Sequence, residues 1–254
     1  MSYFCVMNKI IRGLRFIWAL YTFIILAIVV LTTALFIWTT VLLFGKKAYN
    51  LNLYYSQKIG CKLICVFSFI FITVHGRKYF KRGEGNVIIG NHNSNYDIFI
   101  NSTTLPLHSV FCFLSKSELA KVPAFGIIAR NLTVLVDRRS MTSRVKSLGK
   151  MKEVLNSGKS VWIFPEGTRN KTDEPLLEFQ DGAFQLAVQM KSPIIVNTLV
   201  GIRHINNPNY TVDMSPGLVH SYFEAPISTE GMTSTDIPAL KEQVRNLMLA
   251  RLAK

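Results

Sequence analysis

The sequence predicts an α/β fold: one domain with a mostly parallel central sheet covered by helices, preceded by a hydrophobic helical membrane anchor. Short apolar runs alternate with segments of helical periodicity over most of the chain, a pattern typical of a parallel sheet with both faces covered. An uncharged apolar run near the N-terminus is long enough to cross a bilayer. With 254 residues, the chain can bury a full core as one domain. We therefore divide it into an anchoring motif, residues 1–67, and an α/β domain, residues 68–254.

The predicted anchor is the run "FIWALYTFIILAIVVLTTALFIWTTVLLF", residues 16–44, which contains no charged residue, glycine or proline. As a helix it would be about 43 Å long, against roughly 30 Å of bilayer hydrocarbon. A secretory signal peptide is the alternative. The run is about twice the length of the usual apolar region of such a peptide, and no small-residue cleavage site follows. The pattern therefore favours a retained membrane anchor.

The flanking charges leave the topology of the anchor open between two arrangements. Three cations precede the run and three follow it: Lys9, Arg12, Arg15, Lys46, Lys47 and Lys58. A near tie fits a single span poorly, because single spans usually carry a cationic excess on one side. It fits better with two helices that dip into one leaflet, with residues 46–67 as a second, amphipathic arm. We prefer the two-helix anchor and keep the single span as the alternative.

Charge and cysteine content narrow the classes of partner. The net charge is +14, but the cations are scattered and form no zinc-finger spacing, RNP motif or basic helix, which argues against nucleic acid. Beside a membrane anchor, anionic phospholipids are the simpler partner. The four cysteines form no Cys-x-x-Cys pair, so neither a disulfide framework nor a zinc site is predicted. We expect a reducing environment and a domain on the cytoplasmic face of the membrane, the inner membrane in a bacterium.

The elements of the α/β domain follow in order along the chain. Apolar runs predict strands at residues 69–74, 86–90, 109–115, 132–136, 160–164 and 193–200. Helical spacing predicts helices at residues 94–104, 119–130 (broken near Pro123), 141–156, 182–190 and 236–252.

The stretch "GNHNSNYD", residues 90–97, ends one of these strands with a histidine and an aspartate. On a regular helix, positions five apart lie about 140° out of phase, so the two side chains would not share a face. They can meet if His92 lies in the loop, Ser94 is the N-cap and Asp97 is the third helical residue. A carboxylate on one ring nitrogen leaves the other nitrogen as a base. The alternative is a structural histidine beside a capping aspartate.

No Gly-x-Ser-x-Gly elbow accompanies this pair, so the sequence indicates no serine or cysteine nucleophile. A His-Asp pair without a protein nucleophile suggests that the substrate supplies the hydroxyl group that reacts.

A second motif, "VWIFPEGTRN" (residues 161–170), is an apolar strand that stops at Pro165. Gly167 lets backbone amides approach a ligand, Thr168 offers a hydroxyl, and Arg169 can bind a phosphate through two hydrogen bonds. Glu166 is unusual beside an anion site; it would orient Arg169 or accept hydrogen bonds from a polyol. An ordinary surface turn with an ion pair is the alternative.

Together these motifs resemble those of the glycerolipid acyltransferase family, most closely its 1-acylglycerol-3-phosphate acyltransferases. His-x4-Asp in residues 91–97 is followed some seventy residues later by "FPEGTR", residues 164–169. Between them, "SKSELAKVPAFGIIARNLTVLVDRR" (115–139) is similar to the second block of the family, and "KSPIIVNTLV" (191–200) to its fourth. The resemblance covers roughly residues 70–200, and four blocks in order are highly specific.

The resemblance implies a reaction and a role for each motif. His92 would act as general base, with Asp97 orienting its ring, on the sn-2 hydroxyl of lysophosphatidic acid. The acyl donor would be a thioester of coenzyme A or acyl-carrier protein, the product phosphatidic acid, and no metal or cofactor would be needed. The implied substrate-binding residues are Glu166, Gly167, Thr168 and Arg169, with Arg138 and Lys116 as further candidates for anionic groups.

Two departures from the family pattern keep other functions open. The family usually carries a basic residue in Phe-Lys-x-Gly, where this chain has Gln180 and Asp181, and Asn170 stands where serine is common. The first departure leaves another lysolipid, such as a lysophospholipid or a lyso-ornithine lipid, as an alternative acceptor. A membrane lipid-binding protein without activity is the alternative of a different class.

Overall fold

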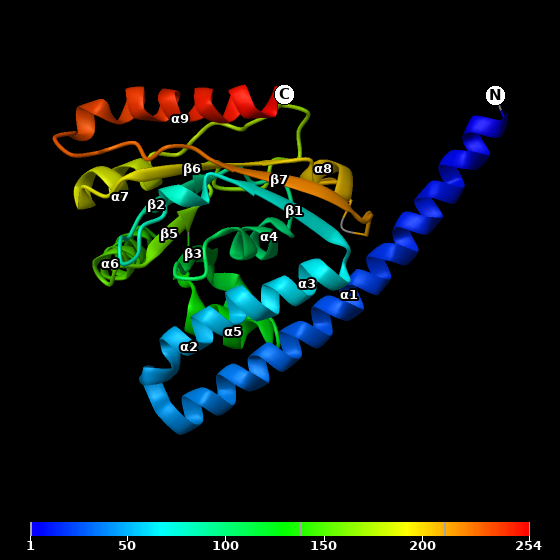
Figure 1. Cartoon of the computed structure of the whole chain (residues 1–254), viewed down its shortest axis with the longest axis horizontal. Helices are drawn as coiled ribbons and strands as arrows, with labels where there is room; N and C mark the ends of the chain where they lie inside the picture. The colour runs from blue at the N-terminus through cyan, green and yellow to red at the C-terminus, as the bar shows by residue number, and fades with distance from the viewer. Residues whose placement is uncertain (1, 138, 211, 254) are drawn as a thin grey trace.

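The central sheet is mostly parallel, as predicted. The computed structural model describes residues 2–137, 139–210 and 212–253, and side chains from Met7 onward apart from Asn8. Among these residues, seven strands form one sheet in the order β1-β7-β6-β2-β5-β3-β4 (Figure 1). The five strands from β6 to β4 are parallel to their neighbours, whereas β7 runs antiparallel to β6 and β1 is parallel to β7.

The strands coincide closely with the apolar runs of the sequence. Their bounds are β1 Ile70–His75, β2 Val87–Gly90, β3 Phe111–Lys116, β4 Val134–Val136, β5 Ser160–Ile163, β6 Ile194–Val200 and β7 Gly217–Phe223. Every residue of β2 and β5 is buried, which explains their continuous apolar sequences. The sequence analysis missed β7, whose seven residues alternate between buried and more exposed positions around His220.

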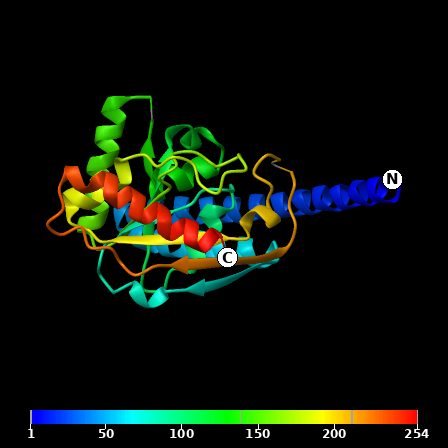
Figure 2. The same ribbon diagram turned by 90° about the horizontal axis from the view of Figure 1, so that it is seen from above.

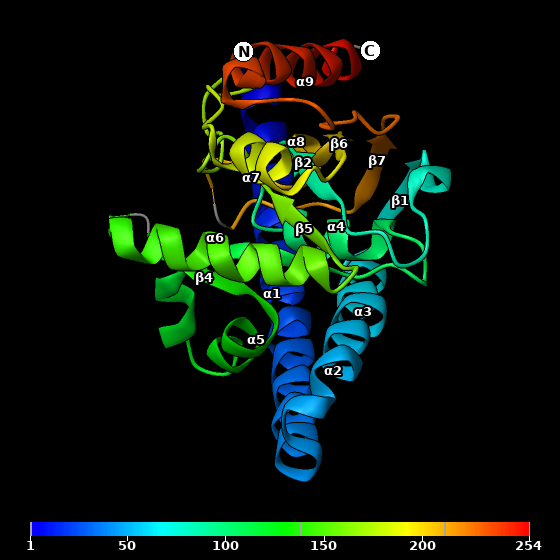
Figure 3. The ribbon, with the colours of Figure 1, turned by 90° about the vertical axis from the view of Figure 1, so that its left-hand side faces the viewer.

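Helices cover both faces of the sheet. The helices of the α/β domain are α4 Asp97–Thr104, α5 Phe125–Leu132, α6 Met141–Asn156, α7 Gly182–Met190, α8 Ile202–Ile205 and α9 Ile237–Leu252. One face packs against α6, α7 and α9 around a core that includes Phe184 and Val244. The other face is covered by α4 and by the N-terminal helices, as Figures 1 and 3 show. Short 3₁₀ turns lie at Arg77–Tyr79, Ser117–Lys121 and Ser234–Asp236.

The N-terminal segment folds as two antiparallel helical arms. Helix α1 spans Ser2–Phe44, and the chain reverses through Gly45–Ala48, where Gly45 has a φ of 58°. The second arm consists of α2 Tyr49–Tyr55, a π-helical segment Ser56–Gly60 and α3 Cys61–Phe67. Among the described residues, the arms are joined by a hydrogen bond from the Tyr21 hydroxyl to the Phe67 carbonyl at 3.0 Å and by one from the Thr40 hydroxyl to Asn52 Oδ1 at 2.7 Å. The N-terminal end of α1 extends beyond the rest of the molecule (Figure 2).

Helix α1 is long and apolar enough to cross a membrane. One side of it is buried against the domain, at positions such as Ala19 and Ile37. The opposite side carries a stripe of exposed apolar residues at helical spacing: Ile17, Ile24, Ile28, Leu31, Leu35, Trp38 and Leu42, which we call the α1 stripe.

The parallel strands place the two sequence motifs next to each other. β2 and β5 are neighbours in register, so their carboxyl ends lie at the same edge of the sheet. β2 leads into the His92 loop and β5 into the Glu166–Arg169 loop, while β3, on the other side of β5, ends at Lys116. Ligands of open α/β sheets bind outside the carboxyl ends of such strands.

Candidate active site

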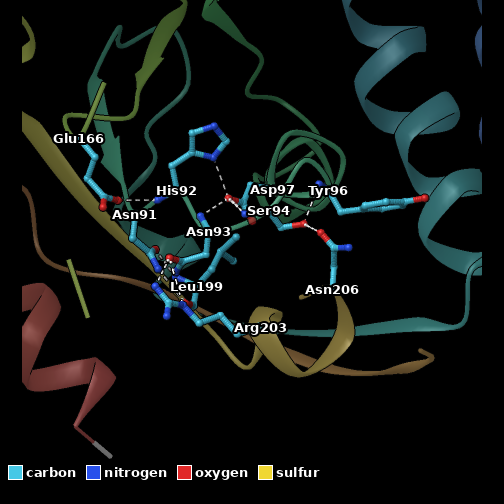
Figure 4. Close-up of polar contacts among 10 residues, drawn as sticks. All are labelled: Asn91, His92, Asn93, Ser94, Tyr96, Asp97, Glu166, Leu199, Arg203 and Asn206. Carbon is cyan, nitrogen blue, oxygen red and sulfur yellow. Dashed lines mark hydrogen bonds and ion pairs between the residues drawn. The ribbon is translucent and has the colours of Figure 1, made fainter. Parts of the chain in front are cut away.

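His92 and Asp97 are in direct contact, as the sequence analysis expected. His92 Nδ1 lies 2.9 Å from Asp97 Oδ2, and the Asp97 side chain is fully buried behind the ring. The His92 side chain keeps 18% of its surface exposed. Figure 4 shows the second ring nitrogen directed away from Asp97, and among the described residues none hydrogen-bonds to it. This geometry fixes a proton on Nδ1 and leaves Nε2 free to accept one.

The loop that carries His92 is ordered around the Asp97 carboxylate. Asp97 Oδ2 also accepts hydrogen bonds from the backbone amides of Asn93, at 2.7 Å, and Ser94, at 2.9 Å. The predicted N-cap needs correction, because α4 begins at Asp97 and Tyr96 occupies the N-cap position. Ser94 still orders this turn, since its hydroxyl oxygen accepts from the Tyr96 amide at 3.0 Å. The carboxylate therefore orients the imidazole and the backbone on which the imidazole is mounted.

Phe164 packs against one face of the His92 ring. The two rings are stacked, with centroids 4.2 Å apart and planes 13° from parallel. Phe164 directly follows β5 and precedes the Glu166–Arg169 loop. The sequence analysis did not single it out, because an aromatic residue at a strand end is ordinarily a core residue.

Glu166 holds the loops after β2 and β5 together. Its Oε1 accepts from the His92 amide at 2.8 Å, and its Oε2 accepts from the Leu177 amide at 2.9 Å. Burial raises the pKa of this carboxyl above its usual value, and the two amide hydrogen bonds partly oppose that shift. Both oxygens face the backbone, which differs from the substrate-binding role expected from the sequence. Glu166 is a positioning residue in this structure.

Further contacts fix the His92 loop from the side of β6, which pairs with the edge of β2 opposite β5. Asn91 accepts from the Leu199 amide at 2.8 Å and donates to the Leu199 carbonyl at 3.0 Å, which ties the loop to β6. Arg203 donates to Asn93 Oδ1 at 3.1 Å, as Figure 4 shows. It also donates to the Thr172 carbonyl at 2.8 Å and so bridges the two motif loops. The sequence analysis missed Asn91 and Arg203, which are separated from their partners by roughly 30 to 110 residues.

The His92 ring opens onto a cavity of about 780 Å³, which we call the catalytic cavity. It brings together five of the predicted site residues: His92, Lys116, Gly167, Thr168 and Arg169. Asp97 and Glu166 lie behind its wall. The predicted Arg138 lies outside the described residues.

The lining of the catalytic cavity combines cationic and apolar side chains. Lys116, Arg169 and Lys171 are the charged lysine and arginine residues of its lining, and no aspartate or glutamate belongs to the described lining. Phe23, Leu26, Ala27 and Val30 of α1 line it together with Phe99 and Phe125. Such a cavity suits a ligand with an anionic head and a hydrocarbon chain. Lys171, which the sequence analysis missed, follows the Arg169 motif by two residues.

Comparison with known proteins agrees with this geometry. The family model described as Acyltransferase matches residues 71–199, which include the dyad and the Glu166–Arg169 loop. The chain belongs to the acyltransferase family. The mouse protein named 1-acyl-sn-glycerol-3-phosphate acyltransferase alpha is 31% identical over 180 residues, covering 70% of this chain and 62% of the mouse protein. The yeast 1-acyl-sn-glycerol-3-phosphate acyltransferase is 33% identical over 169 residues, covering 65% and 55%.

Other relatives of this acyltransferase extend the comparison. The protein named 1-acyl-sn-glycerol-3-phosphate acyltransferase in Haemophilus influenzae is 30% identical over 170 residues, covering 66% of this chain and 68% of that protein. The matches span only 62% and 55% of the mouse and yeast proteins. The crystal structure of the Thermotoga maritima 1-acyl-sn-glycerophosphate acyltransferase, PlsC, superposes with a TM-score of 0.79 at 22% identity, covering 94% of both chains. At 22% identity, this similarity shows that the two proteins share the same fold.

Proposed function

We propose that this protein is a membrane-bound 1-acylglycerol-3-phosphate acyltransferase. It would move a fatty acyl group from a thioester to the sn-2 hydroxyl of lysophosphatidic acid and release phosphatidic acid. The observation that carries the proposal is the His92–Asp97 pair at a cavity lined by both cationic and apolar side chains. The names of the relatives support the same reaction.

The proposed reaction uses one protein base and no protein nucleophile. His92 Nε2 takes the proton of the sn-2 hydroxyl while the oxygen attacks the thioester carbonyl, forming a C–O bond. The tetrahedral intermediate then expels the thiolate as the C–S bond breaks, and the protonated imidazole returns the proton to that sulfur. Asp97 stays ionised and stabilises the imidazolium between the two transfers. General-base assistance of this kind contributes about 10²–10⁴-fold to the rate.

The cations of the cavity are assigned to the phosphate of the acceptor. Arg169 can pair with phosphate oxygens through two parallel hydrogen bonds, whereas Lys116 and Lys171 act as point charges. Thr168 and Gly167 would border the glycerol, and Arg138 remains a candidate for a second anionic group. Glu166 contributes by holding the His92 amide in place. The scheme assigns no step to a metal ion or a bound cofactor.

We assign residues 1–67 to membrane attachment and residues 68–254 to the acyltransferase domain. The α1 stripe faces away from the domain and would contact lipid, while the opposite side of α1 lines the catalytic cavity. The antiparallel arms support the two-helix anchor over a single span. We assign the domain to the cytoplasmic face because the cysteines predict a reducing environment. Because the acceptor and product are lipids, this arrangement lets both move between bilayer and cavity without crossing water.

Lysophosphatidic acid is the acceptor that the cavity favours over other lysolipids. Gln180 and Asp181, where the family usually carries a basic residue, line a different groove and not the catalytic cavity. Their identity therefore removes no cation from beside Arg169. A lysolipid with a zwitterionic head would leave part of the cationic lining without a partner.

An acyl-transfer assay with the full chain in lipid vesicles tests the proposal. Radiolabelled acyl-coenzyme A and acyl-carrier protein are each supplied with lysophosphatidic acid, lysophosphatidylethanolamine or lyso-ornithine lipid. We expect phosphatidic acid as the main product, and the comparison of the two thioesters identifies the donor. A larger kcat/KM with either of the other two acceptors would contradict the proposed acceptor. No transfer to any acceptor would leave a lipid-binding role.

A further inference from the structure

A second groove lies on the other side of the wall that carries Phe164. Its volume is about 650 Å³, and it is formed by the N-terminal half of α6, the first turn of α7 and the carboxyl ends of β3, β4 and β5. Figure 3 shows α6 and α7 side by side on this face of the sheet, opposite the N-terminal helices. We call it the α6–α7 groove. The reaction scheme above makes no use of it.

The α6–α7 groove and the catalytic cavity share part of their lining. Leu114, Phe164 and Gly167 belong to both. Phe164 stacks on the His92 ring, and Gly167, which has no side chain and a φ of 71°, borders both spaces. The groove therefore adjoins the catalytic cavity beside the His92 ring.

The chemistry of the groove suits a long ligand with amide groups and an anionic end. Met141, Val145 and Leu148 of α6 provide an apolar side, and Met141 and Val145 are 67% and 63% exposed. Gln180 and Gln185 offer side-chain amides, and Arg144 contributes a cation at the exposed rim. Asp181 also lines the groove, but its carboxylate pairs with Lys241 at 2.7 Å. Helix α6 as a whole carries four basic residues and one acidic residue.

The proposed reaction needs two substrates whose reacting atoms meet at His92. The catalytic cavity has room and charge for the lysolipid, which approaches from the α1 side. The carrier end of the thioester donor must reach the same point from elsewhere, because it is water-soluble and leaves with the thiol.

We propose that the α6–α7 groove binds the 4′-phosphopantetheine arm of the acyl thioester, with Arg144 facing its phosphate and the thioester passing over Gly167 to His92. This inference rests on the proposed function and names the path of its second substrate. Coenzyme A and acyl-carrier protein share this arm, so the groove serves either carrier.

Direct binding to the full chain in detergent micelles tests the groove. The probes are coenzyme A, free 4′-phosphopantetheine and phosphopantetheinylated carrier protein, measured by isothermal titration calorimetry. Arg144→Glu reverses the rim charge and Gln185→Trp fills the groove. The matched controls are Lys146→Glu, about 200° around α6 from Arg144, and Gln189→Trp, one turn further along α7; neither control residue lines the groove. The two control residues, Lys146 and Gln189, also lie outside the lining of the catalytic cavity.

We expect each groove variant to raise the Kd for every probe about fivefold or more, in line with the loss of one exposed charge contact or of the space itself. The two control variants should bind like the wild type. In acyl transfer, the KM for the thioester should rise in the groove variants while the KM for lysophosphatidic acid stays unchanged. The probe that binds most tightly to the wild type identifies the natural carrier.

Three binding results overturn the inference: a wild type that binds none of the probes, groove variants that bind as tightly as the wild type, or controls that weaken binding equally. Unfolding temperatures of the four variants identify any that fail to fold, and the remaining groove variant then decides. Groove-dependent binding without acyl transfer to any lysolipid would refute the proposed function and leave the groove assignment standing. Acyl transfer with an unchanged thioester KM in the groove variants would refute the groove assignment and leave the proposed function standing.

Discussion

His92 is held on several sides, and its Nε2 atom faces the catalytic cavity. Asp97 fixes Nδ1, Phe164 supports the ring, and Glu166 holds the backbone amide. We expect His92→Ala to lower kcat by about 10²-fold or more, because general-base assistance is worth at least that much. The substituted side chain is partly exposed, so the variant should fold and bind vesicles like the wild type. Acyl transfer and circular dichroism on the same preparation measure both.

The substitution Asp97→Asn keeps the shape of the side chain that contacts His92 and removes its charge. The asparagine oxygen can take the place of Oδ2 and still accept from His92 Nδ1 and the two backbone amides, but it carries no charge to stabilise the imidazolium, so kcat should fall strongly. A folded His92→Ala variant that retains more than a tenth of the wild-type rate would show that another group is the base.

Arg169 differs from the neighbouring lysines in how it can bind a phosphate. It is half-buried at the cavity wall, and no described residue forms an ion pair with it. We expect Arg169→Lys to raise the KM for lysophosphatidic acid about tenfold, because a lysine retains the charge but loses the paired hydrogen bonds. The KM for the thioester should change little. Arg82→Lys, an exposed substitution in the turn before β2, is the matched control.

A rise in the thioester KM alone would assign Arg169 to the phosphates of the donor. The acceptor head would then lie nearer to Lys116 and Lys171. The two KM values, measured in one series of assays, distinguish these outcomes.

At the scale of the elements, the site depends on the loops that follow β2 and β5. Glu166 links them, since one carboxylate oxygen accepts from His92 and the other from Leu177. In Glu166→Gln, the side-chain NH₂ replaces one acceptor, so one buried backbone amide loses its partner. We expect this to cost about 1–3 kcal/mol in the free energy of unfolding. Chemical denaturation measures the loss, and Glu178→Gln, an exposed glutamate in the segment between β5 and α7, is the control.

Glu166→Gln should also lower kcat more than it changes either KM, because the His92 backbone shifts while the cations stay in place. An effect on the KM for lysophosphatidic acid alone would instead favour direct contact between Glu166 and the substrate. That result would restore the role expected from the sequence.

The elements also show which features local sequence can predict. The five parallel strands, α6, α7 and α9 appear within about two residues of their predicted bounds, because each is a buried run or a regular amphipathic helix. The His92–Asp97 contact was predictable, since its partners are five residues apart. β7 was missed because its pairing with β1 and β6, which are distant in sequence, stabilises it as a strand. The backbone contacts of Glu166 were missed for the same reason: its partners His92 and Leu177 come from different parts of the chain.

At the scale of the whole molecule, the proposed anchor and the catalytic cavity share one helix. α1 is buried against the domain on one side, lines the catalytic cavity through Phe23 to Val30, and exposes the α1 stripe on the other side. The second arm is fixed to the sheet, where the Gln57 amide donates to the Phe111 carbonyl at 2.5 Å and Lys58 donates to the Leu105 carbonyl at 3.1 Å. The helical arms therefore form part of the fold, and we expect removal of α1 to open the cavity as well as to remove the proposed membrane contact.

Charges placed on the α1 stripe test membrane attachment without disturbing the cavity. Ile28 and Leu35 are 53% and 60% exposed and lie two turns apart on the outer side of α1. In the double variant Ile28→Lys, Leu35→Lys, each lysine would weaken the free energy of membrane insertion by about 2.5–3.5 kcal/mol if it lay in hydrocarbon. The loss would be smaller if its ammonium reached the headgroups. We expect the partition coefficient onto anionic vesicles to fall at least about tenfold in a sedimentation assay.

The control for this experiment is Met141→Lys, Val145→Lys, which places the same two charges on exposed apolar residues of α6, on the opposite face of the sheet. It should sediment with vesicles like the wild type, because added cations away from the bilayer cost nothing and attract anionic lipid. Equal retention of both double variants would show that the α1 stripe does not contact hydrocarbon. The attachment would then depend on another surface, and the lysolipid would need a path to the catalytic cavity that does not follow α1.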